Sequence, residues 1–165
     1  MREDRAARRS APSPSHGEGA VLFILVWGRQ RKEPDMATIQ PYCAKAVFDP
    51  PTYSQAVKVT GAQTILFLSG QVAYDEKGNP AHRGDFVAQA RAVFRAIQAQ
   101  VEAGGGTLAN VVKLNTYLTD VRQRADLIPV REEFFGKKLP ASTLVGVSAL
   151  AHPDWLIEVE AIAVV

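Results

Sequence analysis

Cysteine and long apolar segments are scarce in this sequence of 165 residues. The single cysteine, Cys43, cannot form a disulfide within the chain, which favours a reducing compartment and predicts a cytoplasmic protein. No group of histidine and cysteine residues has the spacing of a zinc site, so we expect no metal. The apolar run Val21–Trp27 is far shorter than the roughly 20 residues that cross a bilayer, so we expect no membrane partner.

Most of the chain also lacks an excess of either charge sign. The formal net charge is +2, and residues 1–35 account for it with seven basic and five acidic side chains. Residues 36–165 therefore carry 12 basic and 12 acidic side chains. Because binding to nucleic acids depends on cations that meet phosphates, this balance argues against nucleic acid as a partner.

A change of composition near Met36 separates a tail from one domain. Residues 1–35 are polar and irregular around the apolar run, and we expect a disordered tail or a gene-boundary artefact, with Met36 as the true start. A secretory signal is the alternative, although no small-residue cleavage site follows the apolar run. Residues 36–165 have the length of a single domain.

The pattern of residues 36–165 predicts both strands and helices. Strands are expected over residues 44–48, 55–60, 64–72, 110–118, 142–147 and 156–165. Gly61–Gln63 predicts a tight hairpin between the second and third of these strands. Helices are expected over 85–102, capped by Asp85 and ended by three glycines, and over 126–135, provided that Pro129 lies in the first turn.

The helix expected over 85–102 carries apolar residues at helical spacing. They are Phe86, Ala90, Val93, Phe94, Ile97 and Val101. Polar residues such as Gln89 and Arg95 occupy the opposite face. We expect the apolar stripe to pack against a sheet.

The last expected strand, 156–165, is apolar on both faces apart from Glu158 and Glu160. A strand of this kind is buried on both sides, so at least one carboxylate should be partly desolvated. A desolvated carboxylate requires either a partner or a function, because burying it unpaired is costly. Pairing across a subunit interface is the interpretation that we favour for Glu160.

Several segments, taken in order, resemble the RidA family, also called YjgF. They include LFLSGQV, VEAGGGTLANVVKLNTYLTD, LPASTLVGVSAL and IEVEAIAVV, and the resemblance extends from about Tyr53 to the C-terminus. It implies an α+β fold: a single chorismate-mutase-like domain with a mixed β-sheet and two helices packed on one face. It also implies a homotrimer that binds small molecules in clefts between subunits. The activity it implies is hydrolysis of reactive enamines and imines, made by pyridoxal-phosphate enzymes, to keto acids and ammonia without a cofactor.

The resemblance carries roles over to five residues. Tyr53 stands where the family has a cleft tyrosine, and Ser69 and Gly70 stand where groups line the cleft. Glu158 stands where the family has the carboxylate that orients or activates the attacking water. Ser142 follows a proline–alanine step, where imine-hydrolysing members have an arginine that clamps the substrate carboxylate.

Because this arginine is missing, the chain resembles an arginine-less subgroup of the family. A serine hydroxyl offers one neutral hydrogen bond where a guanidinium binds a carboxylate with two, so standard imino-acid hydrolysis is expected to be weak. Leu144 and Ile128 stand where cysteine and asparagine are frequent, which predicts a more apolar pocket. We expect Arg131, Lys137 and Lys138 to be solvated helix-end charges rather than replacements for the clamp.

Three functions agree with these features. The first is a deaminase-type hydrolase acting on a neutral or differently shaped enamine or imine, with water held by Glu158. The second is a non-catalytic trimer that binds a small ligand or a partner. The third is an RNA-directed role, which the balanced charge disfavours.

Overall fold

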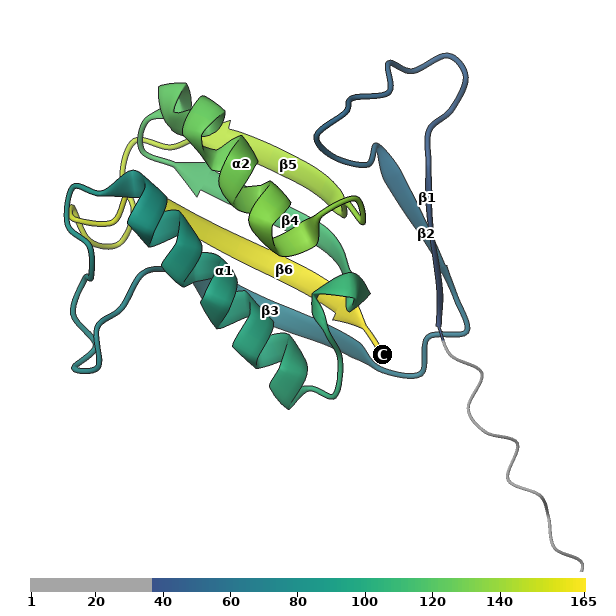
Figure 1. The fold of residues 1–165 in the computed structure, drawn as a ribbon, viewed down its shortest axis with the longest axis horizontal. Helices are drawn as coiled ribbons and strands as arrows, with labels where there is room; N and C mark the ends of the chain where they lie inside the picture. Colours follow the sequence, from purple (N-terminus) through teal and green to yellow (C-terminus); the bar gives the residue numbers. More distant parts are fainter. Residues whose placement is uncertain (1–36) are drawn as a thin grey trace, which may run out of the picture. The chain divides into compact units, whose positions relative to one another are not determined.

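The computed structural model describes residues 37–165, where six strands and two α-helices form (Figure 1). The tail expected over residues 1–35 and the expected start at Met36 lie outside the described residues. The strands are β1 (Thr38–Tyr42), β2 (Ala56–Thr60), β3 (Ile65–Gln71), β4 (Val111–Leu118), β5 (Ala141–Gly146) and β6 (Ile157–Val164). The helices are α1 (Phe86–Ala103) and α2 (Arg124–Phe135), with short 3₁₀ turns at Leu108–Asn110 and Val121–Gln123.

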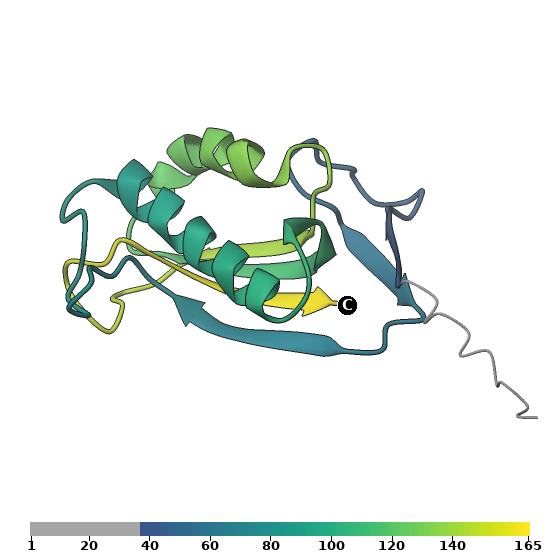
Figure 2. The ribbon, with the colours of Figure 1, turned by 60° about the horizontal axis from the view of Figure 1, so that its bottom comes forward.

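The main sheet has four strands in the order β3-β6-β4-β5. Strand β6 is antiparallel to both of its neighbours, whereas β4 and β5 are parallel and are connected through α2. Both helices cover the same face of this sheet, and the other face carries no helix from the described part of the chain (Figure 2). The expected α+β fold, with a mixed sheet and two helices on one face, is confirmed.

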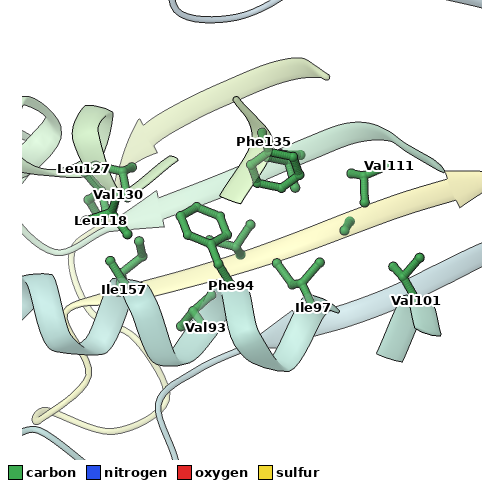
Figure 3. Close-up of a cluster of buried hydrophobic side chains, with 14 of the residues drawn as sticks. Val93, Phe94, Ile97, Val101, Val111, Leu118, Leu127, Val130, Phe135 and Ile157 are labelled. Carbon is green, nitrogen blue, oxygen red and sulfur yellow. The ribbon is translucent and has the colours of Figure 1, made fainter. Parts of the chain in front are cut away.

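The core lies between the helices and the sheet (Figure 3). All six residues of the predicted α1 stripe are buried. They pack against alternate residues of β6, namely Ile157, Val159, Ala161 and Ala163, and against Leu114 and Leu118 of β4. Burying each of the larger side chains contributes about 1.5–3 kcal/mol, so this layer fixes the position of β6 and of the carboxylates on its other face.

Gln89 was expected on the solvent face of α1, and the structure shows it fully buried. Its amide nitrogen donates to the Asp154 carbonyl at 2.7 Å, and its amide oxygen accepts from the Leu156 backbone N–H at 2.9 Å. Trp155 donates from its indole nitrogen to the Ala73 carbonyl at 3.1 Å. These bonds hold the segment that leads into β6, which explains why a polar residue occupies a core position.

The expected strand over 44–48 and the expected β2–β3 hairpin are both wrong. Residues 44–48 form a turn closed by the Val47 N–H and the Ala44 carbonyl, and Phe48 is 78% exposed. Strand β2 pairs with β1 instead of β3. The backbone N–H groups of Gln63 and Thr64 bond to the Val165 carbonyl, so the C-terminus of the chain takes the place next to β3 that a hairpin partner would occupy.

The helix ends follow the sequence signals with one exception. The Asp85 carboxylate accepts from the Ala88 N–H at 2.9 Å, and Gly105 adopts the left-handed conformation with φ 88° after α1, as predicted. Helix α2 begins at Arg124, two residues earlier than expected, which puts Pro129 in the second turn. At that position the proline lacks the N–H that would bond to the Ala125 carbonyl, a loss that the helix tolerates here.

Acid is expected to destabilise the fold through exposed carboxylates. Hydrogen bonds from Arg91 lower the pKa of Glu133 and connect α1 to α2, and hydrogen bonds from Asn79 and Arg122 lower the pKa of Asp75 and Asp120. A carboxylate whose pKa is lowered in the folded state stabilises the protein at pH values above its ordinary pKa, which is near 4. This contribution is lost as the pH falls through the folded-state pKa. The thermal midpoint should therefore fall between pH 5 and pH 3.

The variant Arg91→Gln removes the Glu133 contribution and should make that fall smaller, as measured by circular dichroism melts over the same pH range. An equal fall in the variant and in the wild type would contradict the role given to the Arg91–Glu133 pair.

Candidate functional site

Glu158 and Gly70 meet at an irregularity between β6 and β3. Leu68 pairs with Ala161 and Gln71 pairs with Val159, so β3 contains one residue more than β6 over this interval. The bulge brings the backbone of Gly70 under the Glu158 carboxylate. A Cβ atom on Gly70 would overlap that carboxylate, 2.7 Å from its Cδ and closer still to Oε1. Only glycine leaves room for Glu158 in this position.

The two glutamates of β6 have different surroundings on the face without helices. The Glu160 carboxylate accepts from Tyr117 Oη at 3.2 Å and from Asn115 Nδ2 at 3.3 Å. Glu158 lies opposite Tyr117 in the register, and its carboxylate makes no hydrogen bond or ion pair with any of residues 37–165. Both are half-buried, so within one chain this face of β6 is only partly covered, whereas the opposite face is buried as expected.

Tyr117 was not among the predicted site residues. Burial raises the pKa of its hydroxyl, the hydrogen bond to Glu160 raises it further, and the charges of Glu160 and Glu158 add to the effect. The hydroxyl therefore stays protonated at neutral pH and acts as a hydrogen-bond donor beside the two carboxylates. The alternation of Tyr117 with buried residues in β4 could have placed Tyr117 on this face, but only the register between β4 and β6 puts it opposite Glu158.

Tyr53 and Ser142 meet elsewhere, in a pocket of about 280 Å³ between α2 and the edge strand β5. Backbone pairing of Ser54 with Ala141, and the Ser54 N–H bonded to the Pro140 carbonyl at 3.2 Å, attach the Tyr53 segment to β5. The pocket is also lined by Arg124, Leu127, Ile128, Arg131 and Leu144. Ile128 and Leu144 line the pocket as predicted, but two arginines and several hydroxyl groups line it too, so the pocket is not mainly apolar.

The five predicted residues form two half-sites within one chain. Ser142 pairs with the buried Leu114, which places it on the face that the helices cover, whereas Glu158 lies on the opposite face of the same sheet. Ser69, an exposed residue next to Gly70 in the bulge, lies with the Glu158 half-site. A single chain does not bring the Glu158 carboxylate and the Ser142 hydroxyl to one reacting atom.

The expectation that Arg131 is a solvated helix-end charge is wrong. The residue is 7% exposed, and its Nε and Nη2 atoms are buried without a hydrogen-bond partner among the described residues. Burial lowers the pKa of Arg131, and the nearby charge of Arg124 lowers it further. Lys137 and Lys138 are exposed, in agreement with the prediction for them. The signal that could have identified Arg131 is its spacing, since it follows the buried Leu127 by one helical turn.

Other candidate chemistry is weaker in residues 37–165. No group of three or more histidine, cysteine and acidic side chains is placed to hold a metal in this range. Desolvation and the charge of Asp49 raise the pKa of the Cys43 thiol, which makes it a poor nucleophile. None of the helices described in this range has the length and apolarity that crossing a membrane requires.

Sequence comparison identifies related proteins. A family model described as endoribonuclease L-PSP matches residues 45–165, which include all five predicted site residues. A RutC family protein of Pyrococcus horikoshii is 42% identical over 111 residues, covering 67% of this chain and 85% of that protein. A 2-iminobutanoate/2-iminopropanoate deaminase of Dermatophagoides farinae is 33% identical over 113 residues, covering 68% of this chain and 85% of that protein.

Solved structures share the fold. A Rid family protein of unknown function from Yersinia pestis superposes with a TM-score of 0.70 at 28% identity, covering 77% of this chain and 98% of that chain. RidA from an Antarctic Psychrobacter species superposes with a TM-score of 0.58 at 40% identity, covering 69% of this chain and 89% of that chain. The similarity therefore extends over nearly the whole length of both solved proteins.

Proposed function

We propose that this chain, which belongs to the endoribonuclease L-PSP family that includes RidA, is a deaminase-type hydrolase of small enamines or imines. The observation that carries the proposal is the Glu158 carboxylate, which has no partner in residues 37–165 and lies over a glycine that leaves it room. A relative named as a 2-iminobutanoate/2-iminopropanoate deaminase supports the choice of reaction. The two other members of the site on this side are Ser69 and Gly70.

Glu158 would act as the base that activates water. It accepts a proton from a water molecule whose oxygen bonds to the imine carbon, and the resulting carbinolamine loses its nitrogen as ammonia when the C–N bond breaks. The proton taken by Glu158 passes to the imine nitrogen and completes the carbinolamine. As the C–N bond breaks, Glu158 takes the hydroxyl proton of the carbinolamine and delivers it to the departing nitrogen, so the products are a carbonyl compound and ammonia. An enamine enters the same sequence after protonation at carbon. This reaction needs no redox step.

A second copy of the chain would complete the site. Glu158 and Gly70 lie on one face of the sheet and Tyr53 and Ser142 on the other, so the two half-sites can converge only across a boundary between copies. The face without helices exposes large apolar side chains, with Phe67 76% and Ile65 55% exposed. Apolar surface of this kind marks an interaction site, which supports a homotrimer with clefts between subunits.

The standard imino-acid activity of this chain is expected to be weak because Ser142 stands in place of a clamping arginine. The variant Ser142→Arg should raise the rate of 2-iminobutanoate hydrolysis by about 10- to 100-fold, since a bidentate charged contact replaces one neutral hydrogen bond. The rate is measured as 2-oxobutanoate released from freshly generated 2-iminobutanoate. The variant Ser148→Arg, which makes the same substitution at an exposed serine beyond the end of β5, is the matched control.

Wild-type turnover equal to that of relatives with the arginine would contradict the role given to Ser142. Release of keto acid no faster than without protein, for every enamine and imine offered, would instead favour the non-catalytic ligand-binding trimer. In that case Glu158→Ala would change ligand affinity and remove no turnover. An RNA-directed role would require RNA retention that weakens steeply with salt. The cytoplasmic location stays a prediction.

A further inference from the structure

Arg131 is a buried cation that the proposed reaction does not use. It lies on α2 with only 7% of its surface exposed, and two of its three guanidinium nitrogens are buried without a partner among residues 37–165. The acidic residue next to it in the chain, Glu132, is exposed and forms no ion pair with it. The described part of the chain therefore leaves a positive charge in its interior without compensation.

Such an arrangement is costly unless an anion completes it. A guanidinium stays protonated at neutral pH even when burial lowers its pKa, so it cannot avoid the penalty by losing its proton. An unpaired buried charge costs more than a buried apolar side chain of the same size, and the positive charge of Arg124 adds repulsion. A negatively charged group that enters offsets this cost, because the same low dielectric strengthens its attraction to Arg131.

Arg131 borders two adjoining pockets, although its Nε and Nη2 atoms have almost no solvent contact of their own. Arg131 lines the pocket of about 280 Å³ that contains Tyr53 and Ser142, and also a second pocket of about 470 Å³. Thr52 and Ile128 line both pockets as well, so the two spaces meet at the arginine. Hydroxyl groups from Tyr53, Ser142 and Thr52 can donate to an oxyanion there.

We propose that Arg131 binds the anionic group of the ligand, as a carboxylate, from helix α2 instead of from strand β5. This deepens the proposed function and rests on it in taking that anion to be part of the substrate. The substrate is then an anionic enamine or imine and not a neutral one. Because the cation comes from a different element, the carboxylate is held in a different place from a clamp at Ser142, and the preferred substrate differs in shape from 2-iminobutanoate.

Direct binding of carboxylates tests the proposal without any turnover. Isothermal titration of the full chain with propanoate and with 2-oxobutanoate is expected to show binding that Arg131→Met weakens by about 10- to 100-fold, the loss of a charge-assisted hydrogen bond. Arg131→Lys keeps the charge and should lose less. Arg95→Gln, which removes an exposed arginine from α1, is the matched control and should bind as the wild type does. Methyl phosphate replaces the carboxylates in a parallel arm, and weaker binding is expected there.

Thermal stability gives a second measurement. Carboxylate should raise the thermal midpoint of the wild type and leave that of Arg131→Met unchanged, and without ligand the variant should melt at the same temperature as the wild type or higher. Equal carboxylate affinity of the wild type and Arg131→Met would overturn the proposal. If the wild type bound methyl phosphate more tightly than the carboxylates, the assignment of the anion as a carboxylate would be overturned. A changed oligomeric state of Arg131→Met on a sizing column would also overturn it, because the guanidinium would then pair with a second copy. None of these outcomes depends on whether Glu158 catalyses hydrolysis.

Discussion

Glu158→Gln is expected to lower kcat for imine hydrolysis by about 10²- to 10⁴-fold, the range that a positioned general base contributes. The amide has the shape of the carboxylate but cannot accept the proton of water. Because the Glu158 carboxylate makes no hydrogen bond or ion pair with the rest of residues 37–165, its replacement breaks no side-chain contact of this kind there. Ammonia release under saturating substrate measures the effect, and the thermal midpoint should stay close to that of the wild type.

Glu160→Gln is the matched control for this substitution. Glu160 lies two residues along the same strand on the same face, where it accepts hydrogen bonds from Tyr117 and Asn115. Glutamine keeps an acceptor for these donors, so turnover should remain near the wild-type rate. A large loss of activity in Glu160→Gln together with full activity in Glu158→Gln would show that Glu158 is not the catalytic carboxylate and would refute the proposed mechanism.

Gly70→Ala is expected to lower kcat by about 100-fold while leaving the fold intact. The added Cβ would overlap the Glu158 carboxylate, and the atoms that must move are the end of a flexible side chain and not backbone. Displacing a catalytic group by about 1 Å can cost about 100-fold in rate. The assay is the same ammonia release, combined with a thermal melt to show that stability is largely kept.

Gly146→Ala provides a matched glycine control on β5. A Cβ there would meet Val121 Cβ at 3.6 Å, an ordinary van der Waals distance, so neither activity nor stability should change much. The double variant Gly70→Ala with Glu158→Gln tests the cause. If Gly70 acts by leaving room for the carboxylate, the double variant should be no slower than Glu158→Gln alone. Losses that multiply would show that Gly70 acts independently of Glu158.

Local patterns in the sequence were enough to predict the elements around the core. The stripe of α1 repeats at helical spacing and becomes buried in full, because this pattern follows from the geometry of one element. Strand β6 was expected to be buried on both sides, and one of its two faces is buried within the chain. Asp85 as the cap of α1 is likewise a local feature. Family membership followed from ordered segments that lie in these same elements.

Pairing between distant segments could not be predicted in this way. A period-two pattern indicates a strand but not its partner, so β2 was expected beside β3 and lies beside β1. Gln89 has a polar side chain on a helix, and only the loop that arrives from residues 154–156 supplies the backbone partners that allow its burial. The meeting of Glu158 with Gly70 depends on a bulge in the register between β6 and β3.

The sequence by itself determined the α+β class, the helix that forms most of the core, the family, and the types of side chain available for chemistry. The tertiary structure alone decided which of these side chains meet: Glu158 over Gly70 on one face, and Tyr53 with Ser142 and Arg131 on the other. The physical reason is that secondary structure depends on neighbours within a few residues, whereas the burial and the partners of a charge depend on what packs over it from elsewhere in the chain. Arg131 is the clearest case, since its charge is evident in the sequence and its isolation from solvent is not.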